Sequence, residues 1–158
     1  MSRRGTVINV CVSAQKGTPK QPVGRVRLMK DHGVEGDAHA GTPQRQVSLL
    51  CQESADKLRD GGLVLAPGAF AENLRVSGLE RARMMPGTFL RFERGAVLQV
   101  TQIGKECHTG CAIARAVGRC VMPTEGIFAR VVRGGEVSAG DSLEVLSDEA
   151  DGGGACDQ

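Results

Sequence analysis

The stretch PGTFLRFERGAVLQVTQIGKECH, residues 86–108, combines a turn signal with two consecutive strand patterns. Pro86 and Gly87 suit the two central positions of a type II turn, which reverses the chain. Residues 88–92 and 96–103 are rich in β-branched and apolar side chains, which is typical of strands. No helical pattern separates them, so the stretch predicts an antiparallel β architecture rather than a βαβ unit.

The same alternation of short strands and glycine-rich turns continues in both directions from this stretch. Further strands are predicted at 6–12, 23–29, 46–50, 127–132 and 142–146. Residues 52–60 predict one short helix, and residues 111–119 predict a second. Many short strands without βαβ alternation predict an all-β chain with one or two short helices, folded as a closed or nearly closed β-barrel.

Length and composition argue against some classes of function. The chain has 158 residues, about one domain, with a net charge of +2, four Phe and neither Tyr nor Trp. Few stacking side chains and a weak net charge argue against nucleic-acid binding. No apolar stretch approaches the roughly 20 residues of a membrane span, so a cytoplasmic location with mostly reduced cysteines is expected. Residues 1–146 are predicted to form the domain and the acidic, Gly-rich residues 147–158 a disordered tail.

A polar loop at 30–44 is the first candidate binding segment. It is long and punctuated by glycines, and it contains Asp37 and His39. Long polar loops in compact domains often bind something, although an Asx-turn aspartate and a solvated histidine would look the same. Arg45, which follows the loop, fits either an anion contact or an exposed rim charge.

For several other basic and cysteine residues in the first half of the chain, the sequence predicts a structural position and no role in a binding site. The basic residues Lys20, Arg25 and Arg27 are expected on a solvated face. Cys11 and Cys51 lie inside strand patterns and are expected in the core.

Cys107 is the strongest candidate for chemistry. It follows the predicted strand 96–103, and continued extended geometry would place Lys105 on the same face and His108 on the other. A charge pair at about 4 Å gains about 1 kcal/mol in water and about 4 kcal/mol at an effective dielectric of 20, which favours the thiolate form. A thiolate can ligate a soft metal or attack sulfur. A cysteine that is only a small buried apolar residue remains the alternative.

Two further interpretations of the same cysteines stay open. Cys107, His108, Cys111 and Cys120 could form a structural zinc site, although zinc sites usually present two closely spaced ligand pairs and the second is missing here. Reversible disulfide formation between Cys107 and Cys111 or Cys120 is the other interpretation.

Six sequence blocks, taken in order, resemble a known family, the MOSC domain of molybdenum cofactor sulfurases. They are GVEGD at 33–37, RQVSL at 45–49, PGAFAENL at 67–74, QIGKECH at 102–108, MPTEGIFARV at 122–131 and GD at 140–141. The resemblance implies a pyruvate-kinase-barrel-like β fold and a role around the molybdenum cofactor. It also implies that Cys107 binds the cofactor, as a molybdenum ligand, or carries its sulfur.

The resemblance suggests further site residues. Lys105 and His108 accompany Cys107 as candidate catalytic residues. Candidate cofactor-binding residues are Asp37, His39, Arg45, Asn73, Glu125 and Arg130. A turn-capping Asn73 and a turn-solvating Glu125 are alternatives to ligand contacts.

The resemblance also bears on activity and partners. Ala71 stands where the family often has Gly, which reduces backbone freedom. The sulfurases carry an additional pyridoxal-phosphate domain, for which 158 residues leave no room, so no pyridoxal phosphate is expected. The expected partners are molybdenum cofactor biosynthesis proteins or a molybdoenzyme. Alternative functions are a molybdenum-dependent reductase of N-hydroxylated compounds and a zinc or thiol protein with a structural or redox role.

Overall fold

The computed structural model describes residues 4–15, 20–42, 45–60, 68, 72–80, 83–104 and 126–146, with backbone only at 57–60. The predicted helix at 111–119 and the predicted tail at 147–158 lie outside these ranges, and both stay predictions.

The described chain consists of short strands and one helix. In order they are β1 (Arg4–Val12), β2 (Gln21–Val23), β3 (Arg25–Met29), β4 (Gly33–Val34), β5 (Val47–Cys51), α1 (Gln52–Asp60), β6 (Leu74–Ser77), β7 (Phe89–Phe92), β8 (Val97–Ile103), β9 (Ile127–Arg133), β10 (Gly135–Ser138) and β11 (Ser142–Leu146).

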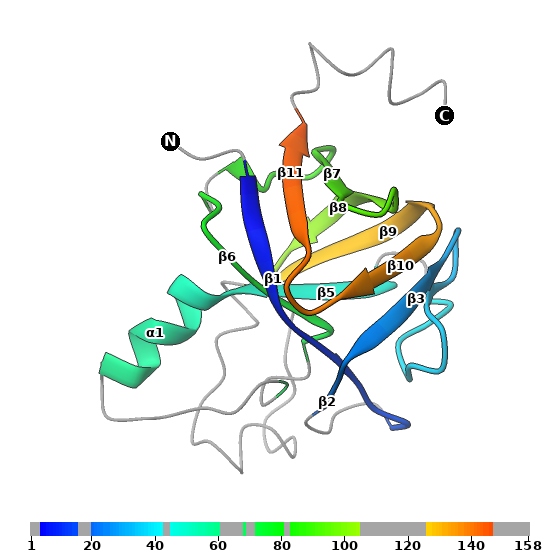
Figure 1. Ribbon diagram of the computed structural model, residues 1–158, viewed down its shortest axis with the longest axis horizontal. Helices are drawn as coiled ribbons and strands as arrows, with labels where there is room; N and C mark the ends of the chain where they lie inside the picture. Colours follow the sequence, from blue (N-terminus) through cyan, green and yellow to red (C-terminus); the bar gives the residue numbers. More distant parts are fainter. Residues whose placement is uncertain are drawn as a thin grey trace.

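Seven strands form a closed barrel, as the sequence predicts (Figure 1). Their order is β11-β7-β8-β9-β5-β6-β1, and pairing of β11 with β1 closes the ring. Every pairing in the ring is antiparallel except that between β5 and β6. Parallel neighbours need a crossover connection, and α1 lies in the segment that joins β5 to β6.

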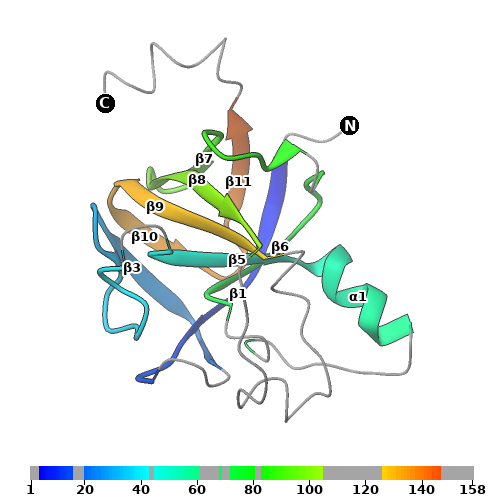
Figure 2. The same ribbon diagram turned by 180° about the vertical axis from the view of Figure 1, so that it is seen from behind.

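A second sheet, β10-β3-β4, lies beside the barrel where β9 ends (Figure 2). The strand predicted at 23–29 is wrong as a single element. Residues 21–23 form β2, which pairs with β1, whereas residues 25–29 form β3, which pairs with β10. Gly24 lies at the break between the two strands. Gly134 alone separates β9 from β10, because Gly135 already begins β10.

The helix α1 spans the nine residues predicted for it. Gln52 Nε2 donates to Asp56 Oδ1 one turn later, at 2.8 Å. Ala55 is buried, and the Glu53 carboxylate accepts a hydrogen bond from the Gly78 amide, just beyond β6. Across the described ranges, no helix has the length and apolar character needed to span a lipid bilayer.

Both faces of the barrel wall are buried at β5. Val47, Leu49 and Cys51 belong to the apolar core, and the alternation of a strand directs Ser48 and Leu50 to the opposite face. All five are nevertheless buried. The barrel therefore has a second buried layer outside its core at this point, and this layer contains the candidate site.

Candidate functional site

Asn73 links three strands of the barrel wall. Its Oδ1 accepts hydrogen bonds from the Ser48 amide at 3.0 Å and from the Ser48 hydroxyl at 3.2 Å. Its Nδ2 donates to the Cys11 carbonyl at 3.1 Å. Asn73 is fully buried and precedes β6, so these contacts join β6 to β5 and β1.

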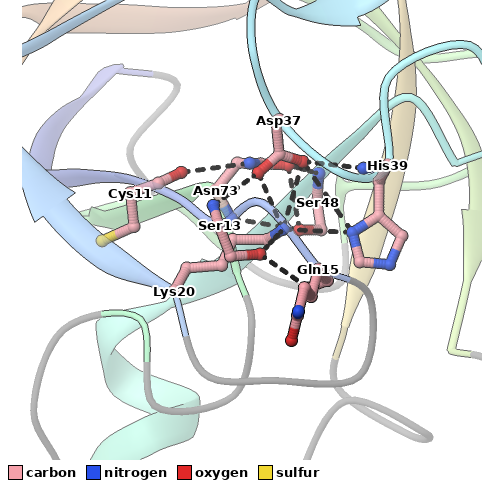
Figure 3. A network of polar contacts seen from close by, with 8 residues as sticks. All are labelled: Cys11, Ser13, Gln15, Lys20, Asp37, His39, Ser48 and Asn73. Carbon is pink, nitrogen blue, oxygen red and sulfur yellow. Dashed lines mark hydrogen bonds and ion pairs between the residues drawn. The ribbon is translucent and has the colours of Figure 1, made fainter.

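A buried ion pair between Lys20 and Asp37 lies next to this link (Figure 3). Lys20 Nζ is 2.8 Å from Asp37 Oδ1 and 3.1 Å from Oδ2, and neither side chain is exposed. The same ammonium is 3.2 Å from Ser13 Oγ and 3.1 Å from His39 Nδ1. The cluster thus joins the end of β1, the residue before β2 and the loop after β4.

Two backbone amides complete the surroundings of Asp37. Ser13 N donates to Oδ1 at 3.0 Å, and His39 N donates to Oδ2 at 3.1 Å. Burial by itself would raise the pKa of Asp37, but the Lys20 ammonium and the two amides outweigh burial and lower the pKa of the carboxyl. Asp37 is therefore an ionised carboxylate that orders the loop.

A second buried ion pair supports the segment before β6. Arg75 donates to Glu72 Oε2 from Nε at 2.9 Å and from Nη2 at 2.6 Å, and the Gly68 amide donates to the same oxygen at 3.0 Å. Gly68 has φ +81° and its carbonyl accepts from the Lys20 amide. A Cβ at this glycine would lie 2.1 Å from the Lys20 carbonyl oxygen, so only glycine fits.

Cys11 is buried beside this ion pair, which confirms its predicted core position, as does the burial of Cys51. Burial, followed by the charge of Glu72, raises the pKa of the Cys11 thiol to about 12, while Arg75 and Lys20 act in the opposite direction. Cys11 therefore stays a protonated thiol at neutral pH.

The predicted arginines lie outside the Lys20–Asp37 cluster. Arg130 on β9 donates from Nε to Gln99 on β8 at 3.1 Å and from Nη1 to Asp31 at 3.4 Å, and its side chain is 41% exposed. Arg45 is half-buried just before β5, and its side chain has no hydrogen bond or ion pair among the described residues.

The predicted residues Lys105, Cys107, His108 and Glu125 lie outside the described ranges. The described chain reaches Gly104 after β8 and resumes at Gly126 before β9, where the Gly104 amide donates to the Gly126 carbonyl at 2.8 Å. Cys111 and Cys120, and with them the predicted zinc site, also lie outside. Within the described ranges, no three His, Cys, Asp or Glu side chains are grouped to hold a metal ion.

Lys20 is the site residue that sequence reasoning placed wrongly. Arg25 and Arg27 are exposed as expected, but Lys20 is 1% exposed. A lysine in a polar segment has no local signal of burial, because its partner Asp37 lies 17 residues away. Ser13 was missed for the same reason, because Asp37 lies 24 residues away from it. Glu72 and Arg75 are only three residues apart, but nothing in their local sequence indicates that both are buried.

Comparison with known proteins identifies the family. The MOSC domain model matches residues 36–144, which include most of the barrel and the loop with Asp37 and His39. The chain belongs to the MOSC domain family. MOSC domains are associated with the molybdenum cofactor, as the sequence resemblance implies.

Individual relatives agree with this assignment. The MOSC chain is 29% identical over 144 residues to YflK of Bacillus subtilis strain 168, a protein described as uncharacterized. That match covers 84% of this chain but only 64% of YflK, so the chain spans less than two thirds of its relative.

Solved structures share the fold. YuaD from Bacillus subtilis superposes with a TM-score of 0.72 at 22% identity, over 92% of this chain and 98% of YuaD. YiiM from Escherichia coli superposes with a TM-score of 0.66 at 25% identity, over 91% of this chain and 70% of YiiM.

Proposed function

We propose that this MOSC domain binds the molybdenum cofactor through the Cys107 thiolate and delivers the cofactor, or sulfur for it, to a cofactor-biosynthesis protein or a molybdoenzyme. The match to the MOSC model over residues 36–144 carries the proposal, because that span contains both the Asp37–His39 loop and Cys107. When bound, the cofactor supplies a molybdenum centre with its own sulfur and oxygen ligands.

The donor groups of the described residues fit an anionic cofactor. Arg45 is half-buried, and its guanidinium has no carboxylate partner among the described residues. His39 is 22% exposed at the edge of the buried cluster. Such donors suit a phosphate or another oxyanion, because hydrogen bonds from charged or oriented donors to anions are strong.

Asp37 and Asn73 serve the proposed site indirectly. Both are buried, and every hydrogen bond described for them is made within the protein. We assign them the role of holding the loop and the barrel wall in position, while neighbouring residues meet the ligand.

We assign the metal contact to Cys107 because its sequence block carries the family resemblance and because a thiolate is a soft metal ligand. The described chain ends three residues before Cys107 at Gly104, which is buried and whose amide donates to the Gly126 carbonyl.

The proposal is tested by cofactor retention. Protein loaded with molybdenum cofactor is desalted, and pterin and molybdenum per chain are measured for wild type, Cys107→Ser and the control Cys156→Ser, which replaces a cysteine with no assigned role. We expect the Cys107→Ser protein to lose the cofactor and the control to retain it.

Two results would overturn the proposal. One is equal retention by the wild type and Cys107→Ser. The other is stoichiometric zinc in the purified protein without cofactor retention, which favours a zinc or thiol protein instead. Mass analysis of the Cys107 peptide, for one additional sulfur atom, separates sulfur carriage from simple ligation.

A further inference from the structure

We propose that Gln46 is a positioning residue that keeps Arg45 out of the hydrogen-bond ladder between β5 and β9, so that both the amide and the guanidinium of Arg45 are available to an oxyanion. The displacement of Arg45 rests on the register and the hydrogen bonds of the barrel wall. The identity of the oxyanion, as a phosphate of the cofactor, rests on the proposed function.

The register of the barrel wall gives Arg45 an expected partner on β9. Val47 on β5 pairs with Ala129 on β9. In an antiparallel pair, a step of two residues back along one strand matches a step of two residues forward along the other. A ladder that continued without a break would therefore bring Arg45 opposite Val131.

The backbone groups of Arg45 would point towards β9 in such a ladder. The amide of Ser48 donates to Asn73 Oδ1 at 3.0 Å, and the carbonyl of Ser48 accepts from the Asn73 amide at 2.9 Å. Both backbone groups of Ser48 thus point towards the β6 side and away from β9. Since consecutive residues of a strand direct these groups to alternate edges, those of Val47 and Arg45 would face β9.

Two other residues bond to Val131 in place of Arg45. The Val131 amide donates to Gln46 Oε1 at 3.0 Å, and the Val131 carbonyl accepts from the Asp31 amide at 3.0 Å. Asp31 has φ 55°, a conformation that is uncommon for a residue with a side chain. Both groups that Arg45 would use are therefore occupied, and β5 begins only at Val47.

Gln46 prevents the Arg45 carbonyl from pairing with Val131. Gln46 is 6% exposed, and a buried N–H such as that of Val131 requires an acceptor. The side-chain oxygen of Gln46 supplies this acceptor, while its backbone carbonyl lies against β4, where a Cβ at Gly33 would be 2.6 Å from it. Without the side-chain oxygen, the register offers the Arg45 carbonyl to Val131 instead.

Arg45 is left with unused donors. It is half-buried, and neither its backbone nor its side chain has a hydrogen bond or ion pair within the described part of the chain. The carboxylate of Asp31, which replaces Arg45 at Val131, is directed to Arg130 at 3.4 Å. Guanidinium groups and backbone amides are common donors to phosphate oxygens, so Arg45 has two kinds of donor for one anion.

The displacement is measured first, on the cofactor-free protein. NMR couplings across hydrogen bonds should connect the Val131 nitrogen with the side-chain carbonyl carbon of Gln46. The Val131 and Asp31 amides should exchange with solvent far more slowly than the Arg45 amide. A coupling from the Val131 nitrogen to the Arg45 carbonyl carbon, or an Arg45 amide as protected as that of Val131, would overturn the proposal.

Gln46→Met tests the cause, because it keeps the length of the side chain and removes the acceptor. In the folded variant, the Val131 nitrogen should become coupled to the Arg45 carbonyl carbon. The matched control is Gln52→Met, which removes a glutamine hydrogen bond in α1 and should leave the Val131 coupling unchanged. A Val131 amide that gains no coupling to Arg45 in Gln46→Met would contradict the role of Gln46. If Gln46→Met does not fold, the wild-type couplings decide.

Titration with inorganic phosphate at constant ionic strength tests the ligand class. The amide and Nε signals of Arg45 should shift in the wild type, and Gln46→Met should bind phosphate about tenfold more weakly, the usual size for one lost hydrogen bond to a charged group. Gln52→Met should bind as the wild type does.

Two results of the titration would overturn the inference. One is the absence of any shift of the Arg45 signals in the wild type. The other is a phosphate affinity of Gln46→Met equal to that of the wild type or of Gln52→Met. Phosphate binding needs no cofactor, so a wild type that binds phosphate at Arg45 and fails to retain the cofactor would contradict the proposed function alone.

Discussion

Neighbouring residues of β5 belong to two different buried regions. Leu49 packs into the apolar barrel core, whereas Ser48, next to it, faces the polar layer outside the wall and is bonded to Asn73. Both are almost completely inaccessible to solvent. The core depends on packing between apolar surfaces, while the polar layer depends on donors and acceptors that must all be matched.

The two regions should therefore respond differently to substitution. An apolar core tolerates the loss of a contact at a cost that scales with the cavity left behind. A buried ion pair does not tolerate the loss of one member, because the other remains as an uncompensated charge. The polar layer is therefore expected to be the less tolerant region.

The largest effect is expected from Lys20→Met. It leaves the Asp37 carboxylate buried without its cation, which should lower the free energy of unfolding by about 3–5 kcal/mol. Urea denaturation measures the change. Arg25→Met is the control, because Arg25 is 63% exposed in its ion pair.

The double variant Lys20→Met/Asp37→Leu removes both charges and should recover much of the lost stability. If Lys20→Met alone lowered the free energy of unfolding by less than about 1 kcal/mol, the Lys20–Asp37 ion pair would not be an important source of stability.

The next effect is the contrast between the two faces of β5. Leu49→Ala should cost about 3 kcal/mol because it opens a cavity in the core. Ser48→Ala should cost about 1 kcal/mol, since Asn73 keeps its bonds to the Ser48 amide and the Cys11 carbonyl. The same denaturation experiment compares the two variants. Equal costs would mean that the two faces are not distinct regions.

The smallest effect is a partial loss of stability in acid. The pKa of Asp37 is lower in the folded protein than in the unfolded chain, where it is about 3.9. Its stabilising contribution is therefore complete above about pH 5 and declines as the pH falls through the lowered folded-state value.

Unfolding of the wild type and the Lys20→Met/Asp37→Leu variant between pH 6 and pH 3 tests this expectation. The wild type should lose more stability than the double variant. Asp31→Asn, at a carboxylate that is 60% exposed, is the control and should follow the wild type. If the free energy of unfolding fell equally with pH in the wild type and the double variant, the predicted contribution of Asp37 would be contradicted.

Much of the fold was predictable because its signals are local. Residue alternation located the strands that became β1, β5, β7, β8, β9 and β11, and α1 matches its predicted bounds. The four residues of β6 gave too short a pattern, and the buried Arg75 in it pairs with Glu72 rather than with solvent. The split between β2 and β3 depends on which sheet each half joins, which no local pattern contains.

The candidate site was predictable only in part. Asp37 and His39 were proposed because they lie in one long polar loop punctuated by glycines and because the family resemblance includes this segment. The function of Lys20 could not be inferred, because the neighbours that define it come from three separate segments. Arg130 resembled an anion contact in the sequence, but its described contacts are with Gln99 and Asp31.

The central claim is that the Cys107 sulfur binds the molybdenum of the cofactor. X-ray absorption at the molybdenum edge, on the free cofactor and on cofactor-loaded wild type, counts the sulfur atoms bound to the metal. Ligation by Cys107 predicts one sulfur ligand more in the loaded protein than in the free cofactor, and loaded Cys156→Ser should match the wild type. The same number of sulfur ligands in the free cofactor and in the loaded wild type would contradict this claim.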